Sequence, residues 1–291
     1  MMRLDDSTVG TVAIGGLRVR RLGYGAMRVS GARNAAGVRD RAEAIKVYRR
    51  AYERGVNFID TANIYGYGES EEILAEALHP YPGDLVIGTK AGFKPGKIEP
   101  GKTSLPPLGH PDHIKEECDK SLRRLRLDHI DLYQVHVPDP GVPYEDTVGA
   151  FAELQQAGKV RHIGVSNVTL EQLAVARSLC TVVSVQNAYN AGIRTSENLL
   201  AACEEAGMAF LPWKPIQLQG TPAAVAAEEI ADERGITRQQ VALAWALAHS
   251  PAMLPIPGTS KLPHLDENID AAFIQLSSDE IARLESAAAP A

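Results

Sequence analysis

The sequence is poor in cysteine. It contains only Cys118, Cys180 and Cys203 in 291 residues, and these three lie far apart within helical patterns. An odd number of widely spaced cysteines argues against both a disulfide framework and a zinc site. We therefore expect buried free thiols in a reducing compartment, and no bound metal.

The sequence also lacks the signals of secretion, membrane insertion and nucleic-acid binding. Residues 1–6 hold no apolar signal-peptide core, and no apolar run reaches the ~18 residues of a membrane-spanning helix. Acidic and basic residues are interspersed, with a net charge of −6, so there is no basic stripe for nucleic acid and no basic amphipathic segment for a membrane surface. We expect a cytoplasmic protein, a monomer or weak homo-oligomer, whose partner is a small molecule.

What the chain does contain is an alternation of apolar strands and amphipathic helices. A hairpin is predicted around Gly15-Gly16, and helical spacing of apolar residues predicts helices such as Ala42–Arg54, which ends at Gly55. Glycines 158 and 207 mark similar helix ends. Eight strands, the number that closes an α/β barrel, are predicted at Leu22–Met27, Val56–Ala62, Leu85–Lys90, Ile130–His136, Val160–Val165, Val182–Gln186, Ala209–Trp213 and Met253–Pro257.

An open dinucleotide-binding sheet is the main alternative fold. It should show Gly-x-Gly-x-x-Gly after its first strand, and neither Gly23–Arg28 nor Gly66–Glu71 completes that motif. Near-continuous apolar strands between amphipathic helices indicate a parallel sheet that is covered on its outer face. We therefore expect one domain over residues 1–291, a (β/α)8 TIM barrel with an N-terminal β-hairpin.

Four titratable residues, Asp60, Tyr65, Lys90 and His136, lie at or just past the ends of three predicted strands. Taken singly, the acid and the lysine could form a structural ion pair, the histidine could be a satisfied core residue, and the tyrosine could merely pack. Polar groups at strand ends cost solvation if they are buried, so their recurrence on neighbouring strands needs a chemical reason. Together they indicate a proton-donating active site.

Several motifs then resemble those of the aldo-keto reductase family, in family order, from about Leu22 to the last helix. They are Phe58-Ile59-Asp60-Thr61-Ala62-x-x-Tyr65-Gly66, Gly88-Thr89-Lys90, the strand-end His136, Gly158–Asn167 and Ile256–Lys261. The resemblance implies a barrel enzyme that binds NADPH without a Rossmann fold and reduces an aldehyde or ketone to an alcohol.

The resemblance and the chemistry assign the four residues the same roles. The cofactor supplies only a hydride, so the protein must supply the proton. Tyr65 is the expected donor, because a phenol with an ordinary pKa of about 10 becomes useful near neutrality when an adjacent cation, here Lys90, stabilises the phenolate. Asp60 would hold the Lys90 ammonium in place, and His136 would orient the substrate oxygen and donate a hydrogen bond to it.

A cofactor site is also implied by the resemblance. The segment at Gly25 would let backbone approach the nicotinamide ribose and pyrophosphate, the group at Ser166 would bind the carboxamide, and Ser260 with Lys261 would bind the adenosine 2′-phosphate at a helix N-terminus. Trp213 would pack on the nicotinamide, or alternatively would only fill the barrel mouth. The expected cofactor residues are Gly25, Ala26, Met27, Ser166, Asn167, Gln186, Trp213, Lys214, Pro215, Ile216, Gly258, Thr259, Ser260, Lys261, His264, Glu267 and Asn268.

Two departures from the family pattern bear on specificity. His264 stands where many relatives carry arginine, which leaves the preference for NADPH over NADH open because imidazole is not an equivalent phosphate ligand. Lys214 replaces a small hydroxyl residue, and the loop after it is short. With a short C-terminal tail, this predicts an open pocket lined by Met27, Ile64, Val137 and parts of residues 93–109, although that last segment could equally be a solvated loop.

The substrate is not readable from the sequence. The segment Arg21–Met27 looks most like the bacterial branch that includes pyridoxal reductases, so pyridoxal is one candidate among aldehydes, ketones and keto-metabolites. Oxidation of an alcohol with NADP⁺ would use the same site. A redox-sensing or regulatory subunit with little turnover is the alternative from another class; it would need a docking surface or an extra N-terminal segment, and the early start of the barrel favours an enzyme.

Overall fold

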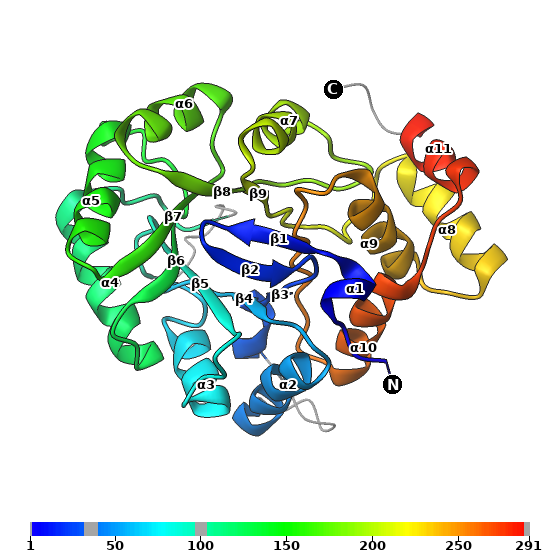
Figure 1. Cartoon of the computed structure of the whole chain (residues 1–291), viewed down its shortest axis with the longest axis horizontal. Coiled ribbons are helices and arrows are strands. Elements are labelled where there is room, and N and C mark those ends of the chain that lie inside the picture. Colours follow the sequence, from blue (N-terminus) through cyan, green and yellow to red (C-terminus); the bar gives the residue numbers. More distant parts are fainter. Residues whose placement is uncertain (1, 32–39, 97–103, 288–291) are drawn as a thin grey trace.

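A computed structural model describes residues 2–31, 40–96 and 104–287 of the chain, and it shows helices wrapped around a curled parallel sheet (Figure 1). The strands are β1 (Thr11–Ile14), β2 (Leu17–Arg20), β3 (Tyr24–Gly25), β4 (Phe58–Asp60), β5 (Val86–Ala91), β6 (Ile130–Val135), β7 (Val160–Ser166), β8 (Val182–Gln186) and β9 (Ala209–Phe210). The helices are α1 (Asp6–Val9), α2 (Arg41–Glu53), α3 (Glu69–Leu78), α4 (Pro111–Leu125), α5 (Tyr144–Gln156), α6 (Leu170–Leu179), α7 (Glu197–Ala206), α8 (Ala223–Arg234), α9 (Arg238–His249), α10 (Leu262–Asp270) and α11 (Ser278–Ser286), with short 3-10 helices η1 (Ala26–Gly31) and η2 (Ala271–Phe273).

The large sheet runs in sequence order from β3 to β9, and each neighbouring pair is parallel. Its two edges are joined by the segment 252–257. On one side the Phe210 amide donates to the Ala252 carbonyl at 2.9 Å, and on the other the Gly23 amide donates to the Pro255 carbonyl at 2.9 Å. The sheet is therefore closed into a barrel, and the predicted fold class is confirmed.

The eighth predicted strand, Met253–Pro257, is the least regular of the set. Over the described residues, seven of the eight predicted segments form strands of the barrel sheet, and this segment does not. Pro255 and Pro257 have no amide hydrogen, so at these positions the segment can accept hydrogen bonds from a neighbouring strand but cannot donate them. It closes the barrel mainly through its carbonyl groups, as with the bond from the Gly25 amide to the Pro257 carbonyl at 3.3 Å.

The predicted hairpin is also confirmed, and it covers the amino-terminal end of the barrel. Strands β1 and β2 pair antiparallel around Gly15-Gly16 and lie across the barrel axis (Figure 1). Ile14 and Val19 are fully buried and belong to the same apolar cluster as Phe58 and Leu132 from the barrel strands. This end is closed by packing, which leaves the carboxyl ends of the strands as the accessible face.

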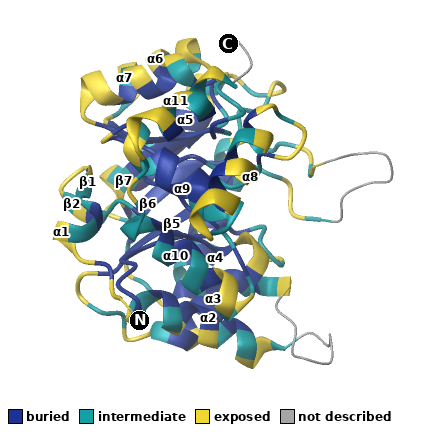
Figure 2. Ribbon diagram, turned by 90° about the vertical axis from the view of Figure 1, so that its right-hand side faces the viewer, coloured by how far each residue is buried: buried dark blue, intermediate teal, exposed yellow. Residues whose placement is uncertain are grey.

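The outer helices bury one face each against the strands, as their apolar spacing predicts (Figure 2). In α2, Ala44, Val47, Tyr48 and Ala51 are buried, and the carboxylate of Asp40 caps the first turn by accepting backbone N–H bonds. The helix was expected at 42–54 and is found at 41–53, followed by a left-handed glycine at 55. In the part of the chain that the structure describes, every helix is too short or too polar to cross a bilayer.

Two glycines allow the first and last barrel strands to meet. A Cβ on Gly25 would lie 2.5 Å from the carbonyl oxygen of Ile256, and a Cβ on Gly258 would lie 2.6 Å from that of Gly25. Both neighbours are backbone atoms and cannot swing aside. The glycines at these positions are therefore required by barrel closure, whatever else the segments bind.

We expect Gly258→Ala to destabilise the protein by about 1–3 kcal/mol, because the new methyl group would push apart two backbones that close the barrel. Gly149→Ala is the matched control, since Gly149 lies inside α5 and a Cβ added there would meet nothing within 4 Å. A helix-interior alanine should leave stability equal or raise it by up to about 1 kcal/mol. Urea unfolding of both variants checks this, and equal stability of the two would contradict it.

Candidate active site

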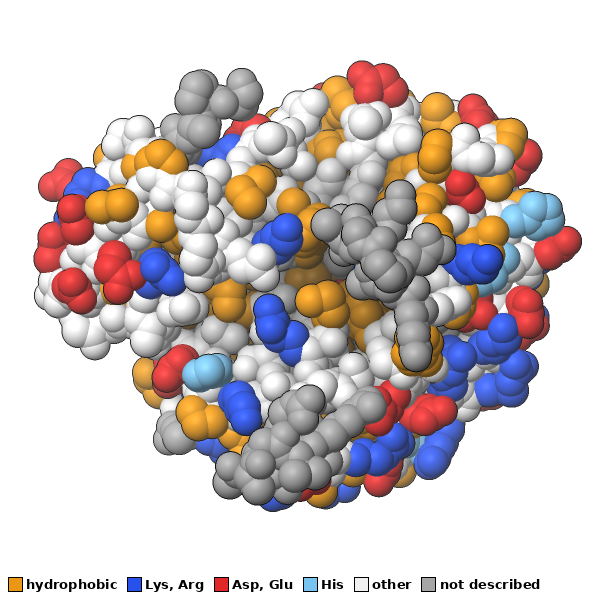
Figure 3. Space-filling model, turned by 180° about the vertical axis from the view of Figure 1, so that it is seen from behind, with side chains coloured by type: hydrophobic (Ala, Val, Ile, Leu, Met, Phe, Trp, Pro, Cys, Tyr) orange, Lys and Arg blue, Asp and Glu red, His pale blue; other side chains and the backbone are white. Residues whose placement is uncertain are grey.

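The four titratable residues predicted from the sequence meet at the carboxyl ends of the strands. Asp60 ends β4, Lys90 lies near the end of β5, and His136 follows β6 directly. Tyr65 lies between β4 and α3, where its amide bonds to the Ala62 carbonyl at 3.1 Å. The face of the molecule opposite the hairpin is hollowed near its centre (Figure 3).

The Lys90 ammonium is at the centre of this cluster. It is fully buried and donates to Asp60 Oδ2 at 2.6 Å, to the Thr61 carbonyl at 2.8 Å and to the Tyr65 hydroxyl at 3.5 Å. An ammonium has three hydrogens, and these three acceptors account for all of them. The bond to the phenol is the longest, so the ammonium is held by Asp60 and the backbone and is directed toward Tyr65.

Electrostatics keep Lys90 charged. Burial lowers the pKa of Lys90, but Asp60 and Tyr65 together outweigh burial, and the net pKa lies above its ordinary value. A buried ammonium with an ionised carboxylate at hydrogen-bonding distance is the arrangement that offsets the desolvation of both groups.

The pKa of the Tyr65 phenol depends on burial and on two charged neighbours. Burial raises the pKa of Tyr65, Lys90 lowers it and Asp60 raises it, and the net pKa is above its ordinary value. The effect of Lys90 has the expected sign, and burial outweighs it in the protein alone. Tyr65 therefore keeps its proton through the neutral range.

His136 is neutral near pH 7. Burial, followed by the Lys90 ammonium, lowers the pKa of His136 well below its ordinary value. Its ring stands edge to face with the ring of Tyr65 at 6.0 Å between centroids and with that of Phe93 at 4.7 Å. Phe93 belongs to the segment 93–109 that was expected to wall the pocket; residues 97–103 of that segment lie outside the described residues.

The residues expected to bind the carboxamide lie beside this cluster, and they already bond to one another. The Asn167 amide nitrogen donates to the His136 carbonyl at 2.9 Å and to Ser166 Oγ at 3.0 Å, while Asn167 Oδ1 accepts from the Trp213 indole at 3.1 Å. Ser166 is buried and accepts at its oxygen, so its own hydroxyl hydrogen stays available. Gln186 instead donates to Asp60 Oδ1 at 2.9 Å.

The segment Trp213–Ile216 forms part of the rim. Trp213 is half-buried, and the exposed Lys214 places its Nζ 4.7 Å from the centre of the Trp213 ring. Lys214 has a left-handed backbone with φ of 59°, and Asn190 donates to its carbonyl at 2.8 Å, which holds the turn. Pro215 is buried and Ile216 half-buried.

The residues expected at the 2′-phosphate cluster around the start of α10. Thr259 is buried, and its carbonyl accepts from the hydroxyl of Tyr24 at 2.6 Å. Lys261 is the N-cap of α10, and its side chain does not cap the helix. The Lys261 amide donates to Thr259 Oγ1 at 3.1 Å, and Pro263 in the first turn has no amide hydrogen, so the positive end of the helix dipole lies beside Lys261. This arrangement fits an anion. Of the remaining expected residues, Ser260 and Glu267 are half-buried, His264 is exposed and Asn268 is buried.

One residue of the cluster was missed from the sequence. Gln134 is fully buried, and its amide nitrogen donates to Asp60 Oδ1 at 3.0 Å. The available signal was the amide two residues after Leu132 in the run Ile130–Val135, at the alternation of a side chain that points into a barrel.

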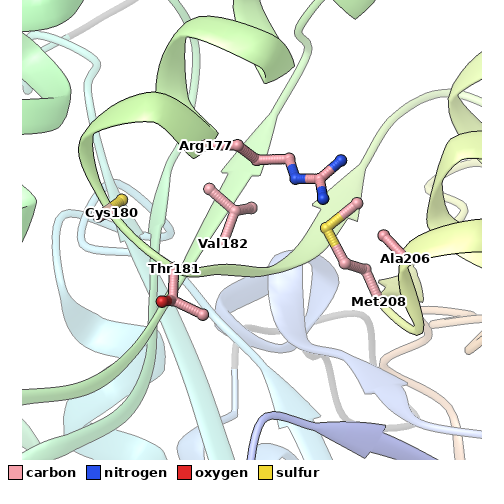
Figure 4. Close-up of a pocket in the computed structure, with 6 residues that line it drawn as sticks. All are labelled: Arg177, Cys180, Thr181, Val182, Ala206 and Met208. Atoms are coloured by element: carbon pink, nitrogen blue, oxygen red, sulfur yellow. The ribbon is translucent and has the colours of Figure 1, made fainter.

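Other candidate sites are weaker. Among the described residues, no group of three or more His, Cys, Asp or Glu could hold a metal ion. All three cysteines are free; two are buried, and Cys180 is only half-buried, contrary to expectation. A cavity of about 250 Å³ next to it (Figure 4) lies at the amino ends of β8 and β9, away from the cluster, and is lined by Arg177, Cys180, Thr181, Val182, Ala206 and Met208.

A closed parallel barrel with an acid, an ammonium, a phenol and an imidazole at the carboxyl ends of its strands is the architecture of a barrel oxidoreductase. Comparison with known proteins identifies the family. The model of the aldo/keto reductase family matches residues 21–289, and the chain belongs to this family.

Similar proteins include an uncharacterized oxidoreductase of Schizosaccharomyces pombe, which is 41% identical over 97% of this chain and 91% of its own length. Pyridoxine 4-dehydrogenase of Escherichia coli is 39% identical over 94% of this chain and 97% of its own length. Among solved structures, an aldo/keto reductase from Klebsiella pneumoniae in complex with NADP and acetate is 28% identical, with a TM-score of 0.78, and the match covers 95% of this chain and 94% of that one.

Proposed function

We propose that this aldo/keto reductase uses NADPH to reduce an aldehyde or ketone to an alcohol, with Tyr65 as the proton donor. The observation that carries the proposal is the Lys90 ammonium, held by Asp60 at 2.6 Å and directed at the Tyr65 hydroxyl at 3.5 Å, beside a neutral His136. These groups can give a proton to a carbonyl oxygen and stabilise the charge that develops there. The solved Klebsiella relative with NADP supports the choice of cofactor.

The chain offers donors that fit such a cofactor. Bound NADPH would supply the hydride, and the rest of the chemistry is left to the protein. The positive end of the α10 dipole, with Lys261, suits the 2′-phosphate, and the exposed ammonium of Lys214 suits the pyrophosphate. Ser166 has a hydroxyl hydrogen for the carboxamide, and Trp213 presents a half-buried ring. The remaining proposed contacts are Gly25, Ala26, Met27, Asn167, Gln186, Pro215, Ile216, Gly258, Thr259, Ser260, His264, Glu267 and Asn268.

The four groups would then divide the proton transfer among them. Tyr65 holds its proton at neutral pH because burial raises its pKa, which suits a donor. As the proton leaves, the Lys90 ammonium would stabilise the phenolate, and Asp60 would keep that ammonium in position. His136, neutral, would donate one N–H to the substrate oxygen and so fix the angle of the carbonyl.

The substrate is proposed only by class. Met27 is 56% exposed, and Ile64 and Val137 are half-buried, which agrees with an open pocket that accepts more than one small carbonyl compound. Pyridoxal is one candidate, because the E. coli relative is named a pyridoxine 4-dehydrogenase. The cytoplasmic location and the monomeric or weakly oligomeric state stay predictions.

The test is NADPH consumption, followed by absorbance, against a panel of aldehydes, ketones and pyridoxal. Turnover of at least one compound by the parent, and its loss in Tyr65→Phe, would support the proposal. Tight NADPH binding without turnover of any compound would contradict it and favour a redox-sensing subunit.

A separate prediction concerns coenzyme preference. We expect Lys261→Ala to raise the KM for NADPH about tenfold and to leave the KM for NADH unchanged, because an ammonium and helix N-terminus act on a 2′-phosphate that NADH lacks. His264→Ala should have a smaller effect of the same sign. Steady-state kinetics with both coenzymes check this, and an equal change for NADPH and NADH would remove both residues from the phosphate site.

A further inference from the structure

The inner oxygen of the Asp60 carboxylate is held by two glutamines. Gln134 Nε2 donates to Asp60 Oδ1 at 3.0 Å, and Gln186 Nε2 donates to the same oxygen at 2.9 Å. Gln186 Nε2 also lies 3.3 Å from Gln134 Oε1, so the two amides are bonded to each other as well. All three side chains are buried. We call Gln134 and Gln186 the amide clamp.

The barrel brings these residues together. Asp60 is on β4, Gln134 on β6 and Gln186 on β8, and alternate strands of a closed barrel contribute side chains to the same interior layer. The intervening strand β7 leaves room for them at Gly164, where a Cβ would lie 3.0 Å from Gln134 Cγ. The clamp is therefore built by the barrel interior and not by a loop.

The chemistry of the carboxylate determines which atom of each glutamine amide, nitrogen or oxygen, faces Asp60. An ionised carboxylate only accepts hydrogen bonds, so both glutamines must present nitrogen to Asp60. With Oδ1 taken by the clamp, Oδ2 is left to face Lys90 Nζ at 2.6 Å. A carboxylate bonded at only one oxygen could rotate about its last torsion, which has a broad energy profile. The clamp removes this freedom.

We propose that Gln134, together with Gln186, is a positioning residue that fixes the Asp60 carboxylate and so directs the Lys90 ammonium at Tyr65. This inference rests on the proposed role of Tyr65 as proton donor. Neither glutamine gives or takes the reaction's proton. Gln134 is fully buried and bonds to Asp60 and to Gln186, so it acts on the reaction through these neighbours.

The test is Gln134→Met, which keeps the length of the side chain and removes the amide. We expect kcat for carbonyl reduction to fall about tenfold, since small misplacements of a catalytic group are costly, while the KM for NADPH stays within about twofold. Because the ammonium lowers the pKa of Tyr65, the pH at which alcohol oxidation begins should move upward in the variant. Ser184→Ala is the matched control, a buried polar side chain on β8 whose hydroxyl has no partner among the described residues, and it should match the parent.

A second readout does not depend on turnover. Ultraviolet titration of Tyr65, with Tyr65→Phe as the blank, should show its ionisation at higher pH in Gln134→Met than in the parent. If the Tyr65 ionisation shifts in Gln134→Met but the parent reduces no carbonyl compound, the result would support the clamp and contradict the proposed function. A parent-like kcat and an unshifted Tyr65 ionisation, with Tyr65→Phe inactive, would overturn the clamp and leave the function standing.

If Gln134→Met does not fold, Gln134→Glu takes its place. A protonated carboxyl at this position can donate to Asp60 as the amide does, whereas an ionised one repels it. The activity of Gln134→Glu should therefore fall with rising pH across a range in which the parent is flat. A parent-like pH profile for this variant would overturn the proposal.

Discussion

Tyr65→Phe is expected to lower kcat for carbonyl reduction by about a hundred- to ten-thousand-fold, the usual contribution of a positioned general acid. The substitution removes only the hydroxyl that lies 3.5 Å from Lys90 Nζ and keeps the ring against His136. NADPH binding, measured by quenching of protein fluorescence, should be unchanged. A variant that turned over at the parent rate would show that another group donates the proton.

Tyr67→Phe is the matched control, because Tyr67 is two residues away and 58% exposed. It should keep the parent rate.

The parent's pH profile adds a further check: since burial raises the pKa of Tyr65, reduction should persist through neutral pH and fall only in the alkaline range. His136 is neutral over the same range, so no loss of activity should occur near pH 6.5. A midpoint near that pH would contradict the assignment of a neutral imidazole.

Lys90→Met is expected to abolish turnover and also to destabilise the fold by about 3–5 kcal/mol, because it leaves the Asp60 carboxylate buried without its cation. Lys90 is fully buried and Asp60 is 2% exposed, so solvent can replace neither partner. The raised pKa of Lys90 means that the stabilisation is complete below the unfolded pKa of about 10.4 and is lost only as pH rises through the higher folded value. Urea unfolding at neutral pH measures the loss.

The double variant Asp60→Asn with Lys90→Met separates catalysis from structure. It removes both charges, so it should recover most of the lost stability and remain inactive. If it recovered activity as well, the ion pair would be a structural feature with no part in the reaction. A Lys90→Met protein as stable as the parent would contradict the buried pair itself.

Much of the fold could be predicted because it depends on local patterns. The helix at 42–54 and the hairpin around Gly15-Gly16 follow from apolar spacing and turn chemistry, and both are found within a residue or so of the prediction. The segment 253–257 was harder: its apolar run predicted a strand, but the prolines withhold the hydrogen bonds that make a strand regular. It still closes the barrel, mainly through carbonyl groups.

Part of the candidate site could likewise be predicted from the sequence, and part could not. Asp60, Lys90 and His136 were predicted because each is a polar residue at the end of an apolar run, a pattern that is visible in a sequence. The clamp glutamine Gln134 was missed because its partner Asp60 lies 74 positions away and no local pattern links them. The net direction of the Tyr65 pKa could not be predicted for a related reason: the charge of a neighbour can be inferred from a sequence, but the extent of burial that opposes it cannot.

The sequence by itself determined the class of fold, the four titratable groups and the family, because each depends on residue types in a fixed order along the chain. Only the tertiary structure decided how those groups act on one another. Lys90 is directed at Tyr65 because Asp60 is held on its far side by amides from β6 and β8, and Tyr65 keeps its proton because burial outweighs the ammonium. Both effects depend on the distances between strands and on the exclusion of water, and these two quantities cannot be obtained from the order of the residues.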